Sequence, residues 1–291
     1  MNLMAPTGCV LSSFYARPAG RHCLSLNDPH TDTADISYAQ FCQLVQELCG
    51  LELAAYKREQ TERRIRAYAA RKGSTSLQVF WASLTTQPNA LQQFLDHLTV
   101  NVTYFFRDME RFIELRDAVL PELLGNRQEL AAWCAGCANG SEVYSLKMLL
   151  HECGAADRVH LLATDIDRTS LARGRRGYYS AQDLHHVPLA YRDAYFLPER
   201  KSFQIVPHLR TGIDFHLHDL LCDPYPSRLD LILCRNVFIY LTQSAQHRVF
   251  RQMHQALRPG GYLLVGNTER IHGLRLPGFV SPRPHFYRRM R

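Results

Sequence analysis

The stretch Leu130-Ala-Ala-Trp-Cys-Ala-Gly-Cys-Ala-Asn-Gly-Ser-Glu142 decides the fold of this chain. Its first part is a short apolar run, which ends at Gly136. Such a run is typical of a parallel strand that is buried on both faces. The small and polar residues that follow lead into a segment with helical pattern, from Glu142 to Cys153. We therefore predict a strand, a tight turn and a helix.

The same alternation continues toward the C-terminus. Three further apolar runs are Val159-His-Leu-Leu-Ala-Thr164, Leu229-Asp-Leu-Ile-Leu-Cys234 and Gly261-Tyr-Leu-Leu-Val-Gly266. A segment with helical pattern, Gln243–Leu257, precedes the last of them and stops at Arg258-Pro-Gly-Gly261. Strands that alternate with helices of this length form βαβ units. The C-terminal half is therefore predicted to be an α/β domain with a doubly wound, Rossmann-like sheet.

An insertion from about 178 to 215 interrupts this alternation. Within it, Ser202-Phe-Gln-Ile-Val206 and Ile213-Asp-Phe-His-Leu217 alternate apolar and polar residues on either side of a turn-like stretch, Pro207–Gly212. Alternation with a period of two is typical of half-buried strands. We predict a small antiparallel β insertion here.

The N-terminal half, from 35 to 100, is predicted to be an all-α bundle. Apolar residues recur at helical spacing in three segments, each preceded by a residue that can cap a helix. These segments are Phe41–Leu48 after Ser37, Leu77–Leu84 after Ser76, and Leu91–Leu98 after Asn89. A further helix opens at Asp108, in a linker from 101 to 124. We expect residues 1–34 to be a loose leader and 125–291 to form the α/β domain.

The composition is that of an ordinary globular protein of 291 residues, with 46% hydrophobic and 21% charged residues. No apolar run approaches the ~20 residues of a membrane-spanning helix. The opening segment Met1–His22 also lacks the apolar region and cleavage site of a signal peptide. We expect no membrane insertion. The formal net charge of +7 favours an acidic partner without naming it.

The nine cysteines are odd in number and scattered along the chain. They form no disulfide framework in a chain of this length, so a reducing, cytoplasmic location fits best. Cys134 and Cys137 have C-x-x-C spacing, but no second pair of ligands follows at comparable spacing. We predict no metal site.

Three predicted strands end in residues that suit a nucleoside-containing cofactor. Ligands of doubly wound sheets bind at the carboxyl ends of the strands. At these ends, Gly136 lets the backbone approach a ligand, Asp165 can accept both ribose hydroxyl protons, and Asn236 can hydrogen-bond through its amide. Each also has a structural alternative: a tight turn, a helix N-cap and a turn-forming asparagine. The three ends do not distinguish S-adenosylmethionine from a nicotinamide cofactor.

The boundary between the two halves carries Asn101-Val-Thr-Tyr-Phe-Phe-Arg107. This segment closely resembles the N-x-T-x-F-F-R signature of CheR-type chemotaxis methyltransferases. The resemblance spans about Asp35 to Tyr287 and keeps the family's order. It continues through Asn139–Ser145, Ala163–Asp167, Gly177–Tyr179, Phe215–Leu220, Cys234–Tyr240 and Leu257–Gly261.

The resemblance implies a helical domain followed by an S-adenosylmethionine-dependent methyltransferase domain. It implies methylation of glutamate carboxylates on chemoreceptors, a protein-glutamate O-methyltransferase activity that yields methyl esters in sensory adaptation. Two alternatives stay open: a methyltransferase with another acceptor, such as RNA or a small molecule, and a non-catalytic module that senses S-adenosylmethionine. The presence of Arg107 and Tyr240 weighs against the second. Nucleic-acid binding explains the charge but not the site, so we expect no nucleic-acid partner.

The resemblance also implies roles for individual residues. Arg107 and Tyr240 resemble residues proposed to flank the incoming glutamate. Ser141 and Val143 depart from the family's glutamate and proline, and Asp219 departs from its asparagine. The residues expected to bind S-adenosylmethionine and its product S-adenosylhomocysteine, with Gly136 added for its turn, are Asn101, Thr103, Arg107, Gly136, Glu142, Asp165, Asp219, Leu220, Asn236 and Val237.

The segment Lys57–Lys72 is strongly basic and has helical pattern. Its composition alone favours a solvated helix face. The resemblance instead implies a basic helix that docks on the acidic helical cytoplasmic region of a chemoreceptor. The turn Pro198-Glu-Arg-Lys201 in the insertion is short and lacks glycine, so we do not expect a receptor's C-terminal tether peptide to dock there.

Overall fold

The computed structural model describes residues 35–99, 102–269 and 278–290. Every element below belongs to one unit, Ile36–Arg291. The N-terminal part of this unit is helical, as predicted. Its helices are α1 (Tyr38–Cys49), α2 (Arg58–Arg71), α3 (Leu77–Thr86) and α4 (Ala90–Leu98), with the short 3₁₀ helix η1 (Leu53–Ala55) before α2.

The predicted caps of this bundle hold at two helices of three. Ser37 forms a capping box with Gln40 at the start of α1, and the Ser76 side chain accepts from the Val79 N–H at the start of α3. Asn89 precedes α4 but makes no capping hydrogen bond, because its backbone is left-handed with φ 61°. The residue type before each helix therefore predicted where the helix begins. Whether that residue makes a capping hydrogen bond depends on its backbone conformation.

Aromatic residues fill the core of the bundle. Phe41, Phe80 and Phe94 are buried, and their ring centroids lie 5.2 to 6.0 Å apart. Such pairs add about 0.5–1.5 kcal/mol to the free energy of unfolding beyond the area they bury. Leu48, which shares the predicted apolar stripe, is 44% exposed because it lies in the last turn of α1.

A helical connection leads from the bundle to the sheet. It consists of α5 (Met109–Glu114), the π-helical segment η2 (Leu115–Val119) and α6 (Leu120–Asn126). The helix predicted to open at Asp108 is confirmed, and Phe112, Leu115 and Val119 are buried.

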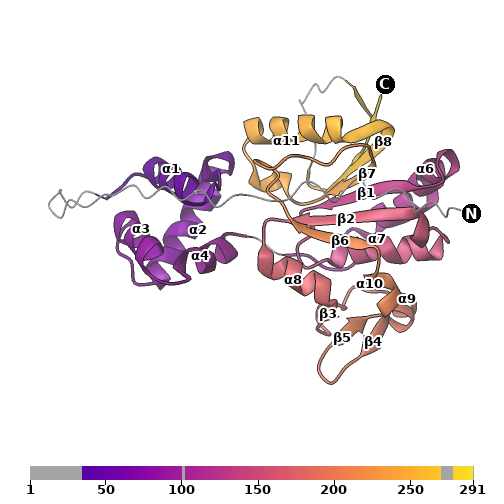
Figure 1. Cartoon of the computed structure of the whole chain (residues 1–291), viewed down its shortest axis with the longest axis horizontal. Helices are drawn as coiled ribbons and strands as arrows, with labels where there is room; N and C mark the ends of the chain where they lie inside the picture. Colours follow the sequence, from indigo (N-terminus) through magenta and orange to yellow (C-terminus); the bar gives the residue numbers. More distant parts are fainter. Residues whose placement is uncertain (1–34, 100–101, 270–277, 291) are drawn as a thin grey trace, which may run out of the picture. The chain divides into compact units, whose positions relative to one another are not determined.

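The sheet is doubly wound, as predicted (Figure 1). Its strand order is β6-β2-β1-β7-β8-β10-β9. The first five strands in this order are parallel to one another. Strand β10 is antiparallel to its neighbour β8, and β9 is antiparallel to its neighbour β10. The strands are β1 (Leu130–Ala135), β2 (Val159–Asp165), β6 (Ile213–Leu217), β7 (Leu229–Cys234), β8 (Leu257–Val265), β9 (Phe279–Arg283) and β10 (Phe286–Arg289).

Helices cover both faces of the sheet. The helices α7 (Ser141–Glu152) and α8 (Arg168–Arg176) lie on one face, and α11 (Gln243–Ala256) lies on the other (Figure 1). Along β1, Ala132 and Cys134 belong to one buried cluster, whereas Trp133 and Ala135 belong to the other. The apolar run of β1 is thus continuous because both of its faces are buried. After β1 the chain continues to β2 on one side of β1, and it later returns to form β7 on the other side. The carboxyl ends of β1 and β7 therefore lie at a topological switch point.

The insertion forms a small antiparallel sheet of order β3-β5-β4. The predicted antiparallel β insertion is confirmed, but one of its two predicted strands belongs to the main sheet. The ribbon predicted between Ser202–Val206 and Ile213–Leu217 is wrong. Pro207 starts a short helix instead of a turn, and β6 then pairs in parallel with β2 at the edge of the main sheet. An edge strand exposes Asp214 while it buries Phe215, and this produces the alternating pattern. The elements are β3 (Tyr178–Tyr179), α9 (Leu189–Tyr195), β4 (Phe196–Pro198), β5 (Phe203–Ile205) and α10 (Pro207–Arg210).

Candidate active site

The turn after β1 and the end of β2 are joined by a carboxylate. Asp165 accepts hydrogen bonds from the backbone N–H of Ala138 at 2.8 Å and of Asp167 at 2.9 Å. Gly136 has φ +81°, and a Cβ there would lie 2.6 Å from Val237 Cγ2. Only glycine fits this position, because Val237, in the loop after β7, packs against the turn after β1.

Asp165 is not the cap of the next helix. Asp167 has that role, since its carboxylate accepts from the N–H groups of Thr169 and Ser170 at the start of α8. Asp165 is 9% exposed, and burial raises the pKa of its carboxyl, although the backbone donors partly offset this. A buried carboxylate with two backbone donors still has lone pairs for a ligand hydroxyl.

Asp219 lies two residues beyond the end of β6, where Leu217 pairs with Asp165 of β2. The backbone N–H of His218 donates to the Asp165 carbonyl, and Asp219 accepts from the Leu221 N–H at 2.8 Å. Burial raises the pKa of Asp219. The Leu220 carbonyl accepts from the Tyr225 hydroxyl at 2.7 Å, which fixes the backbone of the predicted Asp-Leu pair.

Tyr56, from the segment before α2, also reaches this region. Burial raises the pKa of its phenol, and the negative charges of Asp219 and Asp165 raise that pKa further. Its hydroxyl therefore lies within electrostatic reach of both acids. Sequence analysis did not single out Tyr56 as a site residue.

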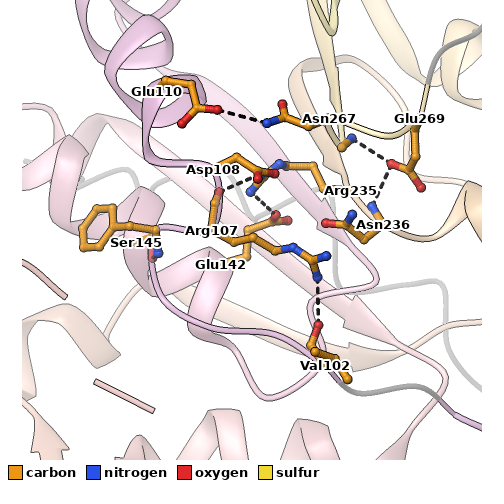
Figure 2. A network of polar contacts seen from close by, with 12 residues as sticks. Val102, Arg107, Asp108, Glu110, Glu142, Ser145, Arg235, Asn236, Asn267 and Glu269 are labelled. Carbon is orange, nitrogen blue, oxygen red and sulfur yellow. Dashed lines mark hydrogen bonds and ion pairs between the residues drawn. The ribbon is translucent and has the colours of Figure 1, made fainter. Parts of the chain in front are cut away.

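A buried arginine connects the end of β7 with the signature segment and the start of α7 (Figure 2). Arg235 donates to Asp108 Oδ2 and to the Arg107 carbonyl at 2.6 Å each. It also donates to Glu142 Oε2 at 3.1 Å. The side chain of Arg235 is 1% exposed, so these three acceptors replace water around a buried cation.

Glu142 thus has a clear partner inside the protein. Burial raises the pKa of its carboxyl, and Arg235 and then Arg107 oppose that shift. Arg107 therefore lies in electrostatic reach of Glu142, and the structure gathers these two predicted residues around Arg235. The arginine has two carboxylate neighbours, Asp108 and Glu142.

Within the signature segment, Arg107 points its side chain back toward the preceding loop (Figure 2). Its Nη1 donates to the Val102 carbonyl at 3.0 Å, and its Cζ lies 5.6 Å from the centroid of the Tyr104 ring. The Tyr104 ring in turn contacts His186 of the insertion, at 4.7 Å between centroids. Thr103 is half-buried in the same loop, and Asn101 lies outside the described residues.

The loop after β7 contains the remaining predicted residues and the 3₁₀ helix η4 (Phe238–Tyr240). The backbone N–H of Asn236 donates to the Glu269 carboxylate at 2.7 Å. Val237 contacts the glycine turn, as described above, and the Tyr240 carbonyl accepts from the Lys57 N–H at 2.8 Å. Within the described ranges, no hydrogen bond joins the Tyr240 hydroxyl to another predicted site residue.

The C-x-x-C pair has the character of core residues. Cys134 and Cys137 are buried, and burial raises the pKa of both thiols well above the ordinary value. Among residues 35–99, 102–269 and 278–290, no group of three or more His, Cys, Asp or Glu side chains is arranged to hold a metal ion. In the same ranges, no helix has the length and apolar character needed to cross a membrane.

These features fit a nucleoside-containing cofactor that lies across the switch point. Gly136 leaves room that a Cβ would fill, Asp165 supplies a buried acceptor for ribose hydroxyls, and Glu142 adds negative charge beside the turn. Such a carboxylate-rich edge suits a cofactor that carries a sulfonium and an ammonium group. The class defined by fold and site is therefore an α/β nucleotide-cofactor enzyme.

Comparison with known proteins identifies the family. The model of the CheR methyltransferase all-alpha domain matches residues 36–99, and that of the CheR methyltransferase SAM binding domain matches residues 101–278. A chemotaxis protein methyltransferase of Listeria monocytogenes is 35% identical over 235 residues, which cover 80% of this chain and 90% of the relative. Chemotaxis protein methyltransferase 1 of Pseudomonas aeruginosa is 29% identical over 254 residues, 83% of this chain and 92% of the relative. The chain belongs to the CheR methyltransferase family, and its cofactor is S-adenosylmethionine.

Three residues of the site escaped sequence analysis: Arg235, Glu269 and Tyr56. Arg235 directly follows β7, a strand whose residues are all buried, and a cation at that place needs buried acceptors. Glu269 follows the apolar run of β8 in the segment Gly266-Asn-Thr-Glu269, at the same edge of the sheet. An ionisable residue just after a buried strand is the signal that pointed to Asp165, and it applies equally to Arg235 and Glu269.

Proposed function

We propose that this methyltransferase esterifies glutamate side chains on the acidic, helical cytoplasmic region of chemoreceptors and so acts in sensory adaptation in the cytoplasm. The curated relatives are named as chemotaxis methyltransferases, which supports this proposal. The observation that carries it is a backbone link between the basic helix and the cofactor edge. The Lys57 N–H donates to the Tyr240 carbonyl, and the Thr242 N–H donates to the Ala55 carbonyl, each at 2.8 Å.

The basic helix α2 begins directly after this link. Its exposed basic residues lie opposite a buried face of Ile65, Tyr68 and Ala69. Glu62 pairs with two of them, Arg58 at 3.0 Å and Arg66 at 2.9 Å. The other exposed cations of this segment are Lys57, Arg63, Arg71 and Lys72. An acidic helix that docks on this face is brought to the loop of Tyr240.

Arg64 differs from the other basic residues of α2. It is half-buried, and it donates to the carbonyls of His97, in the last turn of α4, and of Thr99, just after α4, at 2.7 and 3.3 Å. Burial lowers the pKa of its guanidinium, and the Tyr240 hydroxyl opposes this shift. One cation of the basic helix is therefore bound to the end of α4.

The chemistry needs positioning more than proton transfer. When bound, S-adenosylmethionine supplies an activated methyl group on its sulfonium sulfur. A solvent-exposed glutamate with its ordinary pKa of ~4.3 is already ionised near neutral pH, so no general base is required. Arg107 holds one carboxylate oxygen through charge-assisted hydrogen bonds, and Tyr240 orients the other through its hydroxyl. A single arginine and a neutral hydroxyl hold the carboxylate without quenching its nucleophilicity.

Incubation with radiolabelled S-adenosylmethionine and a purified chemoreceptor cytoplasmic fragment tests this function. We expect label on the receptor that is released by mild base, because glutamate methyl esters hydrolyse there while amide and amine methylation persists. Replacement of the receptor's candidate glutamates by alanine should abolish the label. Base-stable label, or label on RNA alone, would show another acceptor.

The docking surface is tested by a matched pair of variants. Arg63→Glu reverses an exposed charge on α2, and Arg168→Glu reverses an exposed charge at the start of α8. We expect Arg63→Glu to raise KM for the receptor severalfold, more at low salt, while Arg168→Glu changes it little. Equal effects of both variants would assign the effect to net charge and not to α2.

A further inference from the structure

We propose that Glu269 is a positioning residue for methyl transfer: its buried carboxylate holds the loop after β7, which carries Asn236 and Tyr240, in the shape that the reaction requires. This inference rests on the proposed roles of those two residues. Glu269 itself is 5% exposed and lies just after β8, next to the end of β7 in the sheet.

The carboxylate of Glu269 binds backbone N–H groups from both strand ends. Oε2 accepts from the N–H of Gly266 and from that of Asn236, both at 2.7 Å, and Oε1 accepts from the Ile239 N–H at 3.3 Å. Figure 2 shows the first two of these bonds, which meet at one oxygen. A buried N–H without an acceptor costs about 1–3 kcal/mol, so the conformation of this loop depends on the carboxylate.

The loop needs such support because its backbone turns sharply. Asn236 has φ 61°, in the left-handed region, where residues other than glycine are uncommon. The turn sends the N–H groups of Asn236 and Ile239 toward a common point, and Glu269 lies at that point. Beyond it, η4 places Tyr240, whose carbonyl is bound by Lys57.

Gly266 leaves the space that the carboxylate occupies. A Cβ on this residue would lie 2.8 Å from Glu269 Oε2 and 2.9 Å from Asn236 Nδ2. The absence of a side chain at Gly266 therefore leaves room for the Glu269 carboxylate, and the carboxylate binds the loop after β7.

The distinction from a purely structural role lies in what a variant loses. Glu269→Gln keeps the shape of the side chain but offers one acceptor oxygen in place of two. Its NH₂ group must then face an N–H donor, either that of Ile239 or those of Gly266 and Asn236. The loop must shift to separate the donors, and Asn236 and Tyr240 move with it. A positioning mechanism is sensitive to shifts of this size.

The experiment compares Glu269→Gln with Glu110→Gln in the full-length enzyme. Glu110 is an exposed acid whose side chain accepts from the Asn267 side chain at 3.0 Å, so it matches the charge and the neighbourhood of Glu269. Among the described residues, its side chain makes no hydrogen bond to the loop from Asn236 to Tyr240. Well below the melting temperature, we expect Glu269→Gln to lower turnover at saturating cofactor and receptor tenfold or more, and to weaken S-adenosylhomocysteine binding severalfold. Glu110→Gln should leave both near wild type.

A lowered melting temperature with normal turnover and normal S-adenosylhomocysteine affinity would overturn the proposal, because it would reduce Glu269 to a structural support. If Glu269→Gln does not fold, Gly266→Ala tests the same point by displacing a carboxylate that stays charged, and normal turnover in that variant overturns the proposal. If the wild-type enzyme does not methylate receptors, the proposed function fails separately, and the binding comparison still decides the role of Glu269.

Discussion

The guanidinium of Arg235 donates to the carboxylate of Glu142 across 3.1 Å and so joins the end of β7 to the start of α7. The same guanidinium binds Asp108 and the Arg107 carbonyl, and it lies 5.3 Å from the centroid of the Phe112 ring. Three segments that are far apart in the sequence thus meet at one buried cation. The backbone of Arg107 is fixed by this contact, while its side chain binds the Val102 carbonyl in the preceding loop.

We expect Arg235→Met to lower the free energy of unfolding by about 3–5 kcal/mol, because it leaves buried acceptors without their cation. The control is Arg116→Met, which breaks a 2.6 Å pair with Asp117 whose side chains are 38% and 55% exposed. Exposed pairs contribute little to the free energy of unfolding, because water screens them. Urea unfolding followed by fluorescence measures both variants, and similar losses would contradict a structural role for the buried network.

Asp165→Ala should weaken the binding of both S-adenosylmethionine and S-adenosylhomocysteine. The loss of hydrogen bonds to a charged acceptor costs roughly 1.5–3 kcal/mol, which corresponds to roughly a 10- to 150-fold rise in Kd. Asp214→Ala removes an exposed acid from the neighbouring strand β6 and serves as the control. Calorimetry that finds unchanged affinity in Asp165→Ala would place the cofactor elsewhere.

Local signals were enough to predict much of the fold. The N-cap of α1, the buried run of β1 and the acid at the end of β2 can each be recognised from residues within a few positions along the sequence. The pairing of Ile213–Leu217 was mispredicted because an edge strand and a hairpin strand share the same alternation, and only contact with β2 separates them. The local sequence pattern therefore predicts that a segment is a strand more reliably than it predicts which strand it pairs with.

The polar contacts of the site were harder to predict. Arg235 reaches Asp108 and Glu142, which are 127 and 93 residues away in the sequence, and no local spacing links such partners. Glu269 likewise serves a turn 33 residues earlier. What the sequence does contain is an ionisable residue directly after an apolar run, which signals a buried charge but not its partner.

The acid Asp219 predicts a particular pH dependence of stability. Burial raises the pKa of its carboxyl, so the folded state binds a proton more readily than the unfolded state does. The cost of the buried charge is therefore fully present above the raised pKa and disappears as the pH falls toward the ordinary value of ~3.9. Asp219→Asn, which restores the residue of the resembled family, should be more stable than wild type at pH 7.

This gain in stability should shrink as the pH is lowered toward 4, because wild-type Asp219 then becomes neutral as well. Thermal unfolding of both proteins without cofactor, at several pH values, measures the difference. Asp214→Asn, on the exposed side of β6, supplies the control. A difference that stays constant with pH would show that Asp219 does not carry a buried charge.

One of the two backbone hydrogen bonds between the helical bundle and the loop after β7 can be removed by a single substitution. Lys57 has φ −58°, and Tyr56 before it is extended with ψ 153°, so proline fits this position without strain. Lys57→Pro removes the N–H that binds the Tyr240 carbonyl, whereas Lys57→Ala keeps it; both remove the charge. We expect turnover at saturating substrates to be severalfold lower in the proline variant, and equal turnover would separate this bond from catalysis.

A conservative substitution at Arg107 separates catalysis from cofactor binding. Its guanidinium is oriented from two sides, by the Val102 carbonyl at 3.0 Å and by the Tyr104 ring at 5.6 Å. Arg107→Lys keeps the positive charge but loses the planar fork and its stacking. If Arg107 orients the substrate carboxylate, turnover should fall by an order of magnitude or more, because small misplacements are costly when the enzyme acts by positioning. Cofactor affinity should fall less, since Glu142 and Asp165 stay in place. Turnover at saturating cofactor, set against directly measured cofactor affinity, decides between the two roles: a collapse of affinity with normal saturated turnover would make Arg107 a cofactor anchor and refute its role toward the substrate.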